Sequence, residues 1–262
     1  MAYLKLQIQN AAGEILAEST GEGRVELCYF QSYAEGDRIV LTSSEHPIHL
    51  FWQVDDVLGG SLCYLTRDMT YSVPFDEKKR VYSPNAFSGE KHFLFAQTAE
   101  DWQIHNYRNL AVNVADQHRI EGCYPHADAN VETRGESVFE AKNAIDGVCG
   151  NHCHGNWPYA SWGINRDPNA CMRLDFGRPV QIDRLGICLR ADFPHDSYWT
   201  EGTVTFSDGT TEKLHFQKTD RIQYFTIVPR TVQWLTFDKL VKAEDESPFP
   251  ALTQIEVYGK DI

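Results

Sequence analysis

Residues 172–187, MRLDFGRPVQIDRLGI, decide the fold of this chain. They lie within two apolar runs, residues 170–177 and 181–190, which are short and predict β-strands. Phe206–Thr210 holds an Asp-Gly turn, which indicates a hairpin. Further strand signals follow this pattern at residues 200–209, 211–217, 223–228, 231–240 and 251–259. Because helical periodicity is lacking, we expect an antiparallel β-sandwich here.

The first hundred residues carry a second set of strand signals. The runs are short, rich in β-branched and aromatic residues, and separated by turns with glycine, proline or asparagine. They lie at residues 3–9, 24–30, 37–43, 49–55, 61–66 and 91–98. The spacing predicts a β-sandwich of no assigned family over residues 1–105.

The pattern changes near residue 106, where a long irregular stretch begins. It contains one short helical signal, at Val138–Asn143. Strands resume after it, so we place a second β-sandwich in residues 106–262. The predicted fold class is therefore all-β, with two antiparallel β-sandwiches in tandem.

The composition argues against some classes of binding partner. The formal net charge is −13, and phosphate binding needs clustered Lys and Arg, so we expect no nucleic-acid partner. No apolar run has the roughly 20 residues that span a bilayer, so we expect no membrane insertion. The N-terminus is typical of a strand, and seven cysteines, an odd number, favour a reduced, cytoplasmic chain. The oligomeric state stays open.

Three motifs of the second half carry a family resemblance. NAIDG at residues 143–147, the stretch at 172–187, and LTQIEVYG at residues 252–259 occur in this order. Together they resemble the discoidin-like domain of coagulation factor 5/8 C-terminal type, a group that includes the family 32 carbohydrate-binding modules. The resemblance covers residues 106–262 and implies a galactose-binding-like jelly roll, which can serve many functions.

The resemblance also implies a structural calcium site at the NAIDG loop. Asp146 would supply a carboxylate, and Asn143 and Val148 would supply carbonyl oxygens. The last strand would contribute Gln254, next to Thr253, where the family usually has a glutamate. Glutamine brings no charge to a cation that prefers several oxygen ligands. The alternative is a metal-free loop that Asp146 holds through hydrogen bonds to backbone amides.

Zinc is disfavoured although Cys149, His152, Cys153 and His154 lie close together in sequence. Zinc sites usually draw ligand pairs from two separated segments, and the chain has no second pair of this kind. A disulfide between Cys149 and Cys153 is conceivable only in an oxidising compartment.

The loop that follows suits a sugar. Sugars pack their apolar C–H faces on aromatic rings and need directed polar partners for their hydroxyl groups. Trp157 and Tyr159 offer rings, and His154 offers a polar group. Either Trp157 or Trp162 is expected to fill the sandwich core, and the sequence leaves open which.

A second candidate loop, residues 189–202, contains Arg190, Asp192, His195 and Trp199. The resemblance implies that Arg190 and His195 bind sugar hydroxyls, with Trp199 as a stacking ring and Asp192 as a polar partner. The alternative is an ion pair between Arg190 and either Asp192 or Asp196 that fixes the loop. His126 and Arg134, in the irregular stretch, can approach the same face.

We therefore expect a non-catalytic, lectin-like carbohydrate-binding protein. Common catalytic motifs such as Gly-x-Ser-x-Gly and His-Glu-x-x-His are absent from the sequence. One alternative is a glycan-active hydrolase or lyase with its site between the domains, using His154 or His195. Another is a protein–protein adhesion or scaffold module.

Overall fold

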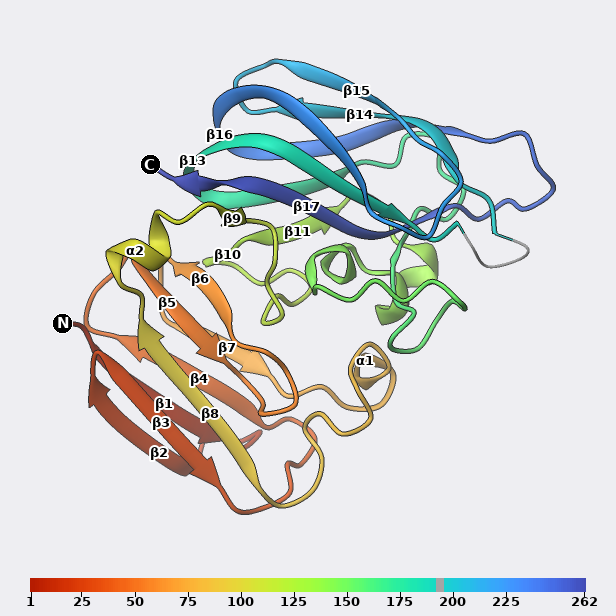
Figure 1. The fold of residues 1–262 in the computed structure, drawn as a ribbon. Coiled ribbons are helices and arrows are strands. Elements are labelled where there is room, and N and C mark those ends of the chain that lie inside the picture. Colours follow the sequence, from red (N-terminus) through yellow and green to blue (C-terminus); the bar gives the residue numbers. More distant parts are fainter. Residues whose placement is uncertain (192–195) are drawn as a thin grey trace.

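The chain folds into two strand-rich units. The computed structural model describes residues 1–191 and 196–262. Figure 1 shows the N-terminal strands, red to yellow, in one unit and the C-terminal strands, cyan to blue, in the other. The segment drawn in green lies where the two units meet. The strand pairings are antiparallel in both units, which confirms the predicted all-β fold of two tandem sandwiches.

The first unit is built from β1 (Tyr3–Gln9), β2 (Ile15–Glu22), β3 (Arg24–Tyr29), β4 (Arg38–Ser43), β5 (Ile48–Gln53), β6 (Ser61–Leu65), β7 (Met69–Ser72), β8 (His92–Thr98) and β10 (Cys123–Tyr124). These strands form two sheets, with the orders β2-β1-β4-β7 and β10-β6-β5-β8-β3. Alternate residues of β3, β5 and β6 are buried. This follows from the alternation of side chains across a strand, which places every second residue between the sheets.

Aromatic rings fill the first core. Tyr71 packs edge-on against Trp52 and stacks on Phe87. Ala115 and Cys123 belong to the same core, although they lie beyond residue 105. Side chains from the start of the second half therefore complete the first core, and the boundary between residues 105 and 106 stays a prediction.

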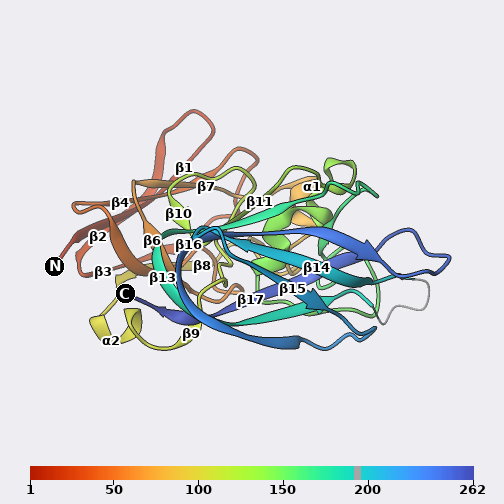
Figure 2. The same ribbon diagram turned by 90° about the horizontal axis from the view of Figure 1, so that it is seen from above.

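The second unit is built from β9 (Arg108–Asn109), β11 (His126–Ala129), β12 (Trp162–Gly163), β13 (Met172–Leu189), β14 (Trp199–Phe206), β15 (Thr211–His215), β16 (Gln223–Lys242) and β17 (Ala251–Asp261). Their order is β12-β17-β13-β16-β14-β15, with β11 on β13 and β9 on β17. The first part of β13 pairs with β11, and its later part pairs with β17. Register shifts interrupt β13 and β16, so these long strands pass from one face of the sandwich to the other (Figure 2).

Turns and short helices join these strands. The hairpin at Asp208–Gly209 is confirmed: β14 pairs with β15, and Gly209 has a φ of +83°, which glycine adopts without strain. The helices are α1 (Asp76–Lys79), α2 (Asp101–Ile104), η1 (Thr133–Gly135), η2 (Ser137–Phe139) and η3 (Ala141–Ile145). The helix expected at Val138–Asn143 is thus present as two short 3₁₀ turns, η2 and η3.

A buried charge cluster joins the two units. Asp261, at the end of β17, accepts hydrogen bonds from Arg178 of β13 and from Arg108 of β9. His49 of β5, in the first unit, lies 3.3 Å from the same carboxylate. One carboxylate of the last strand therefore contacts both sandwiches.

All seven cysteines lie in the described residues, and each carries a free thiol. Cys149 and Cys153 are thus not joined in this structure. Among the described residues, no helix combines the length and apolar character needed to cross a bilayer.

Candidate functional site

The end of the second unit carries a cavity of about 220 Å³, which we call the rim cavity. Segments 133–139 and 163–166 line it together with the connection between β16 and β17. Its charged, polar and aromatic side chains among the described residues are Thr133, Arg134, Phe139, His154, Asn165, Arg166, Arg190, Asp196 and Phe249. Pockets for drug-sized ligands measure about 300–1,000 Å³. The rim cavity therefore suits a small ring rather than an extended molecule.

Arg190 and Asp196 form a buried ion pair in the rim cavity. Arg190 Nε donates to Asp196 Oδ2 over 2.8 Å, and Nη2 lies 3.4 Å from Oδ1. Both side chains are buried. Further donors of Arg190 reach Ser161 Oγ and the Phe249 carbonyl oxygen. This confirms the ion pair with Asp196 that the sequence left as an alternative.

Burial also acts on the pKa of Arg190. It lowers the pKa of Arg190 below its ordinary value, and the Asp196 carboxylate offsets part of that effect. Because most guanidinium N–H groups of Arg190 bind protein oxygens, the side chain acts chiefly as an anchor. It holds the segment after β13 against Phe249, on the connection to β17.

Phe249 offers the exposed ring of the rim cavity. It is 42% exposed and lies between Pro248 and Pro250. Proline fixes its own φ and disfavours the helical region for the preceding residue, so these neighbours hold Phe249 in an extended backbone. The guanidinium carbon of Arg166 lies 4.3 Å from the ring centroid, a cation–π contact.

Three residues that line the rim cavity have strained backbone conformations. Arg134, Asn165 and Arg166 have φ values of 55°, 48° and 61°, and all three line the rim cavity. Non-glycine residues rarely adopt such values, and strained backbone is concentrated at functional sites. The Asn165 amide donates to Thr133 Oγ1 over 2.9 Å, which ties the two strained segments together.

The structure brings together some of the predicted site residues. His154 and Arg190 line the rim cavity, and so does Arg134. Asp192 and His195 lie outside the described residues. Arg166 and Phe249 were not predicted as site residues, because their turns carry no recognised motif. The Pro-Phe-Pro triplet was the one local signal for a fixed, outward aromatic ring.

The prediction for Trp199 was wrong. We expected its ring to stack on a ligand, but it is fully buried and packs against Trp162 and Phe237. Trp199 begins β14, and its strand directs the ring into the sandwich. Trp162 is also fully buried, so it is the tryptophan that fills the core.

Trp157 and Tyr159 lie outside the rim cavity. Trp157 is 39% exposed, but it lines a different, small cavity beside Tyr82 and Asp146. Its backbone amide donates to the Arg80 carbonyl oxygen, which turns this loop toward the first unit. Tyr159 is half-buried and does not line the rim cavity. The aromatic loop is therefore split between the core and the junction of the units.

The NAIDG loop is closed by an amide. Gln254 Nε2 donates to Asp146 Oδ1 over 2.6 Å and to the Asn143 carbonyl oxygen over 2.8 Å. Gln254 Oε1 accepts from the Gly147 amide, which fixes the orientation of the side chain. Val148 donates its own amide to Asp146 Oδ1, as the metal-free alternative expected.

These contacts do not fit a calcium ion. An N–H donor points at the two oxygens that would bind the cation. Burial raises the pKa of Asp146 to about 7 in this metal-free loop. Thr253 is also turned away, because its hydroxyl donates to Asn151 Oδ1. We derive no role for calcium, and the metal site remains a prediction.

Two other groups of side chains have the spacing of metal ligands within the described ranges. They are Asp55, Asp56 and His92 in the first unit, and His118, Glu132 and Glu140 near the junction. Neither includes a residue of the segment 149–154, for which a zinc site was considered.

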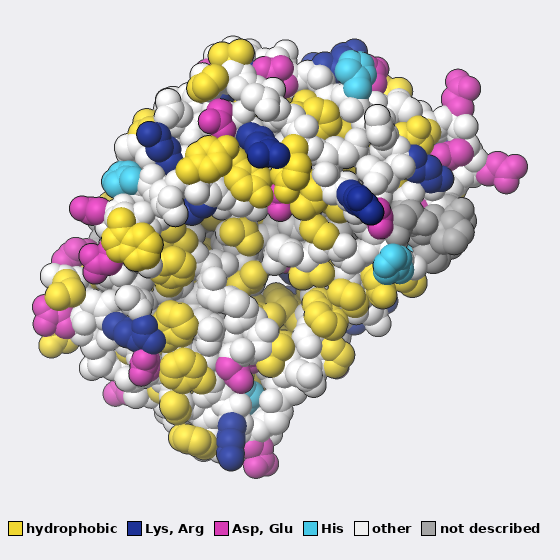
Figure 3. All heavy atoms as spheres, in the orientation of Figure 1, with side chains coloured by type: hydrophobic (Ala, Val, Ile, Leu, Met, Phe, Trp, Pro, Cys, Tyr) yellow, Lys and Arg dark blue, Asp and Glu magenta, His cyan; other side chains and the backbone are white. Residues whose placement is uncertain are grey.

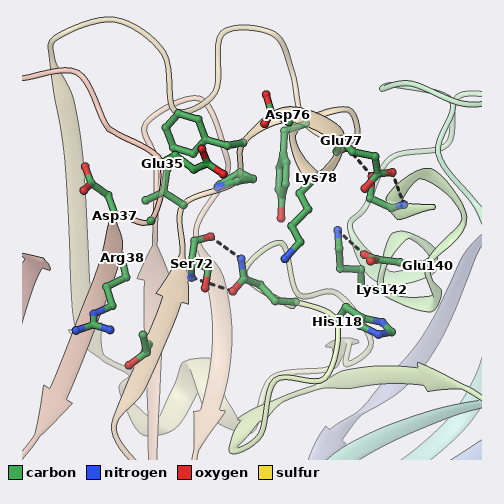
Figure 4. Close-up of a pocket in the computed structure, with 18 residues that line it drawn as sticks. Glu35, Asp37, Arg38, Ser72, Asp76, Glu77, Lys78, His118, Glu140 and Lys142 are labelled. Atoms are coloured by element: carbon green, nitrogen blue, oxygen red, sulfur yellow. Dashed lines mark hydrogen bonds and ion pairs between the residues drawn. The ribbon is translucent and has the colours of Figure 1, made fainter. Parts of the chain in front are cut away.

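A larger cleft of about 690 Å³ lies between the two units. Figure 4 shows Glu35 and Arg38 on one side and Glu140, Lys142 and His118 on the other. Lys142 Nζ lies 3.9 Å from Glu140 Oε2. Burial raises the pKa of Glu140, and the Lys142 charge opposes that rise. The cleft thus holds a carboxyl group that keeps its proton more readily than usual.

Comparison with known proteins gives structural neighbours only. No protein-family model matches the chain, and no curated protein matches it. Similar solved structures are carbohydrate-binding modules and lectin domains. One is chitosan-binding module 1 of a chitosanase/glucanase from Paenibacillus sp. IK-5, with 20% identity and a TM-score of 0.38 over 58% of this chain and 99% of the module.

Two further neighbours are the lectin domain of lectinolysin complexed with Lewis B antigen and a family 32 carbohydrate-binding module of C. perfringens NanJ with galactose. The first has 13% identity and a TM-score of 0.42 over 58% of this chain and 97% of the domain. The second has 16% identity and a TM-score of 0.38 over 50% of this chain and 91% of the module. These values are too low to carry a ligand over to this chain.

Proposed function

We propose that the protein binds a carbohydrate, without catalysis, in the rim cavity. The observation that carries this proposal is the exposed Phe249 ring beside the anchored Arg190–Asp196 pair. A sugar needs one apolar surface for its C–H face and polar groups placed for its hydroxyls. The rim cavity offers both within a volume that suits one sugar ring.

The structure of the site supports a preformed binding surface. The Arg190–Asp196 ion pair and the two prolines around Phe249 fix the positions of the side chains before a ligand arrives. Little ordering is then required on binding. The contact area is small, so we expect weak affinity for one sugar unit and a gain from multivalent ligands.

Isothermal titration against a panel of methyl glycosides tests the proposal. We expect heat with at least one glycoside, and we expect Phe249→Ala to weaken that binding at least tenfold, since a buried aromatic contact is worth about 1.5–3 kcal/mol. Trp157→Ala is the matched control, because Trp157 is an aromatic residue of similar exposure outside the rim cavity. Equal losses in both variants would argue against this site.

The interunit cleft supports a second candidate, a glycan-active hydrolase or lyase. Glu140, with its raised pKa, is a suitable general acid, and His118 lines the same cleft. Turnover of a polysaccharide panel that Glu140→Gln abolishes would favour this function. Binding without turnover would favour the rim cavity alone.

A further inference from the structure

Arg166 differs from the other arginines of the rim cavity in having an unoccupied edge. Its guanidinium face lies over Phe249, and among the described residues no carboxylate or carbonyl is paired with its N–H groups. A stacked guanidinium keeps its in-plane donors available, and these match the two oxygens of a carboxylate or sulfate. We infer that the sugar bound here carries such an anionic group and that Arg166 binds it. This inference rests on the proposed function.

The other two arginines are already satisfied. Arg190 is paired with Asp196 inside the protein. Arg134 binds Glu136 through two hydrogen bonds, from Nε and from Nη2. Arg166 is therefore the arginine of this cavity whose donors the described residues leave available.

The charge around the cavity points the same way. Three arginines line it, against the Asp196 carboxylate. Among the described residues, when Glu136 is counted with its partner Arg134, one positive charge remains, although the whole chain carries −13. Figure 3 shows acidic side chains projecting where β16 connects to β17. The acidic residues of that connection, Glu244–Glu246, do not line the cavity.

The backbone holds Arg166 in place. The consecutive left-handed residues Asn165 and Arg166 are unfavourable for side chains with a Cβ, and the hydrogen bond from Asn165 to Thr133 maintains them. In this turn the Arg166 guanidinium stacks on Phe249, which places its donors at the rim cavity.

Titration with matched sugars tests the inference. The probes are the methyl glycosides of glucose, galactose and mannose, the corresponding uronides, and sulfate esters of the same glycosides. We expect at least one uronide or sulfate ester to bind about tenfold more tightly than its neutral parent. The preference should shrink as salt is added, because the charges lie near the surface. The uronide and sulfate arms show which anion is preferred.

Arg166→Gln should remove most of that preference, measured as the ratio of the affinities for the charged sugar and its neutral parent. Arg184→Gln is the matched control. Arg184 also stacks on an aromatic ring, 4.1 Å from the centroid of Tyr224, but lies outside the cavity. We expect it to bind like the wild type. Both residues are exposed, and a thermal melt confirms that each variant is folded.

Two results would overturn the inference. If neutral sugars bind as tightly as charged ones and Phe249→Ala weakens them, the sugar site stands and the anionic specificity is wrong. If no glycoside of either kind binds, the proposed function is wrong and the inference is lost with it.

Discussion

At the scale of single residues, the sequence predicted that some side chains lie at the site, but it did not predict what they bind. Arg190 was predicted to donate to a ligand, and it does line the cavity, but its donors bind Asp196, Ser161 and the Phe249 carbonyl oxygen. Residues 190 and 196 are close enough along the sequence for an ion pair to be possible. The choice between a ligand and a neighbour depends on burial, which the residue types alone do not determine.

The buried pair yields a stability prediction. Asp196→Ala leaves the Arg190 guanidinium buried without its counter-charge, so we expect a loss of about 3 kcal/mol in the free energy of unfolding. Glu136→Ala, which breaks the solvent-screened pair with Arg134 on the same rim, should cost much less. Urea denaturation at neutral pH measures both. Equal losses would show that burial of Asp196 does not matter.

Gln254 yields a prediction about metal dependence. Gln254→Glu removes the donor that bridges Asn143 and Asp146 and adds a carboxylate beside Asp146. We expect a loss of about 2 kcal/mol without divalent cations. Millimolar calcium should restore part of the melting temperature, because the loop then has the charge that a hard cation needs. The wild-type melting temperature should not respond to calcium. A clear rise in that temperature would contradict the account that the Gln254 amide, not a cation, bridges Asn143 and Asp146.

At the level of elements, the alternation of apolar and polar residues predicted most strands. Runs such as residues 24–30 and 49–55 keep one face buried, and the structure shows that alternation. The sequence pattern did not reveal the lengths of β13 and β16, because bulges reset the alternation within each strand. These bulges let both strands serve two faces of the sandwich.

Close packing of β17 on β13 depends on a glycine. A Cβ added at Gly259 would lie 2.0 Å from the Gln181 carbonyl oxygen, which is backbone and has little room to move. Gly259→Ala should therefore cost about 2–3 kcal/mol in unfolding free energy. Gly59→Ala, where an added Cβ meets no heavy atom within 4 Å, serves as the control in the same urea titrations. A Gly259→Ala variant as stable as the control would disprove this packing.

At the scale of the whole molecule, the sequence did not predict which residues distant along the chain lie close together in space. The rim cavity unites residues near 134, 166, 190 and 249, which are distant along the chain and carry no shared motif. The family resemblance pointed to the loop that holds Arg190, and the mixture of aromatic and polar residues in the earlier loop pointed to His154. Neither gave a sign of Arg166, whose position depends on two strained backbone residues.

We expect the stability of the junction between the units to depend on pH through Asp261. Burial favours the neutral carboxyl group, but hydrogen bonds from His49 and Arg178 and the charges of Arg178 and Arg108 hold its pKa well below the ordinary value. A lowered pKa adds stability above the unfolded value, about 4, and that stability is lost as pH falls through the folded value.

Asp261→Asn should therefore reduce the free energy of unfolding by about 3 kcal/mol at neutral pH. The difference from the wild type should narrow as the pH falls below about 4, because the wild type then loses the same contribution. Chemical denaturation across the pH range measures the difference. A gap between the two proteins that stays constant with pH would refute this role for Asp261.

The most direct test of the central claim, that the rim cavity binds a sugar, is a crystal structure of the protein soaked with the tightest-binding glycoside. We predict electron density for one sugar ring against Phe249, within hydrogen-bonding distance of Arg166 and of the polar groups beside Arg190. A sugar bound in the interunit cleft or beside Trp157, with the rim cavity empty, would contradict it.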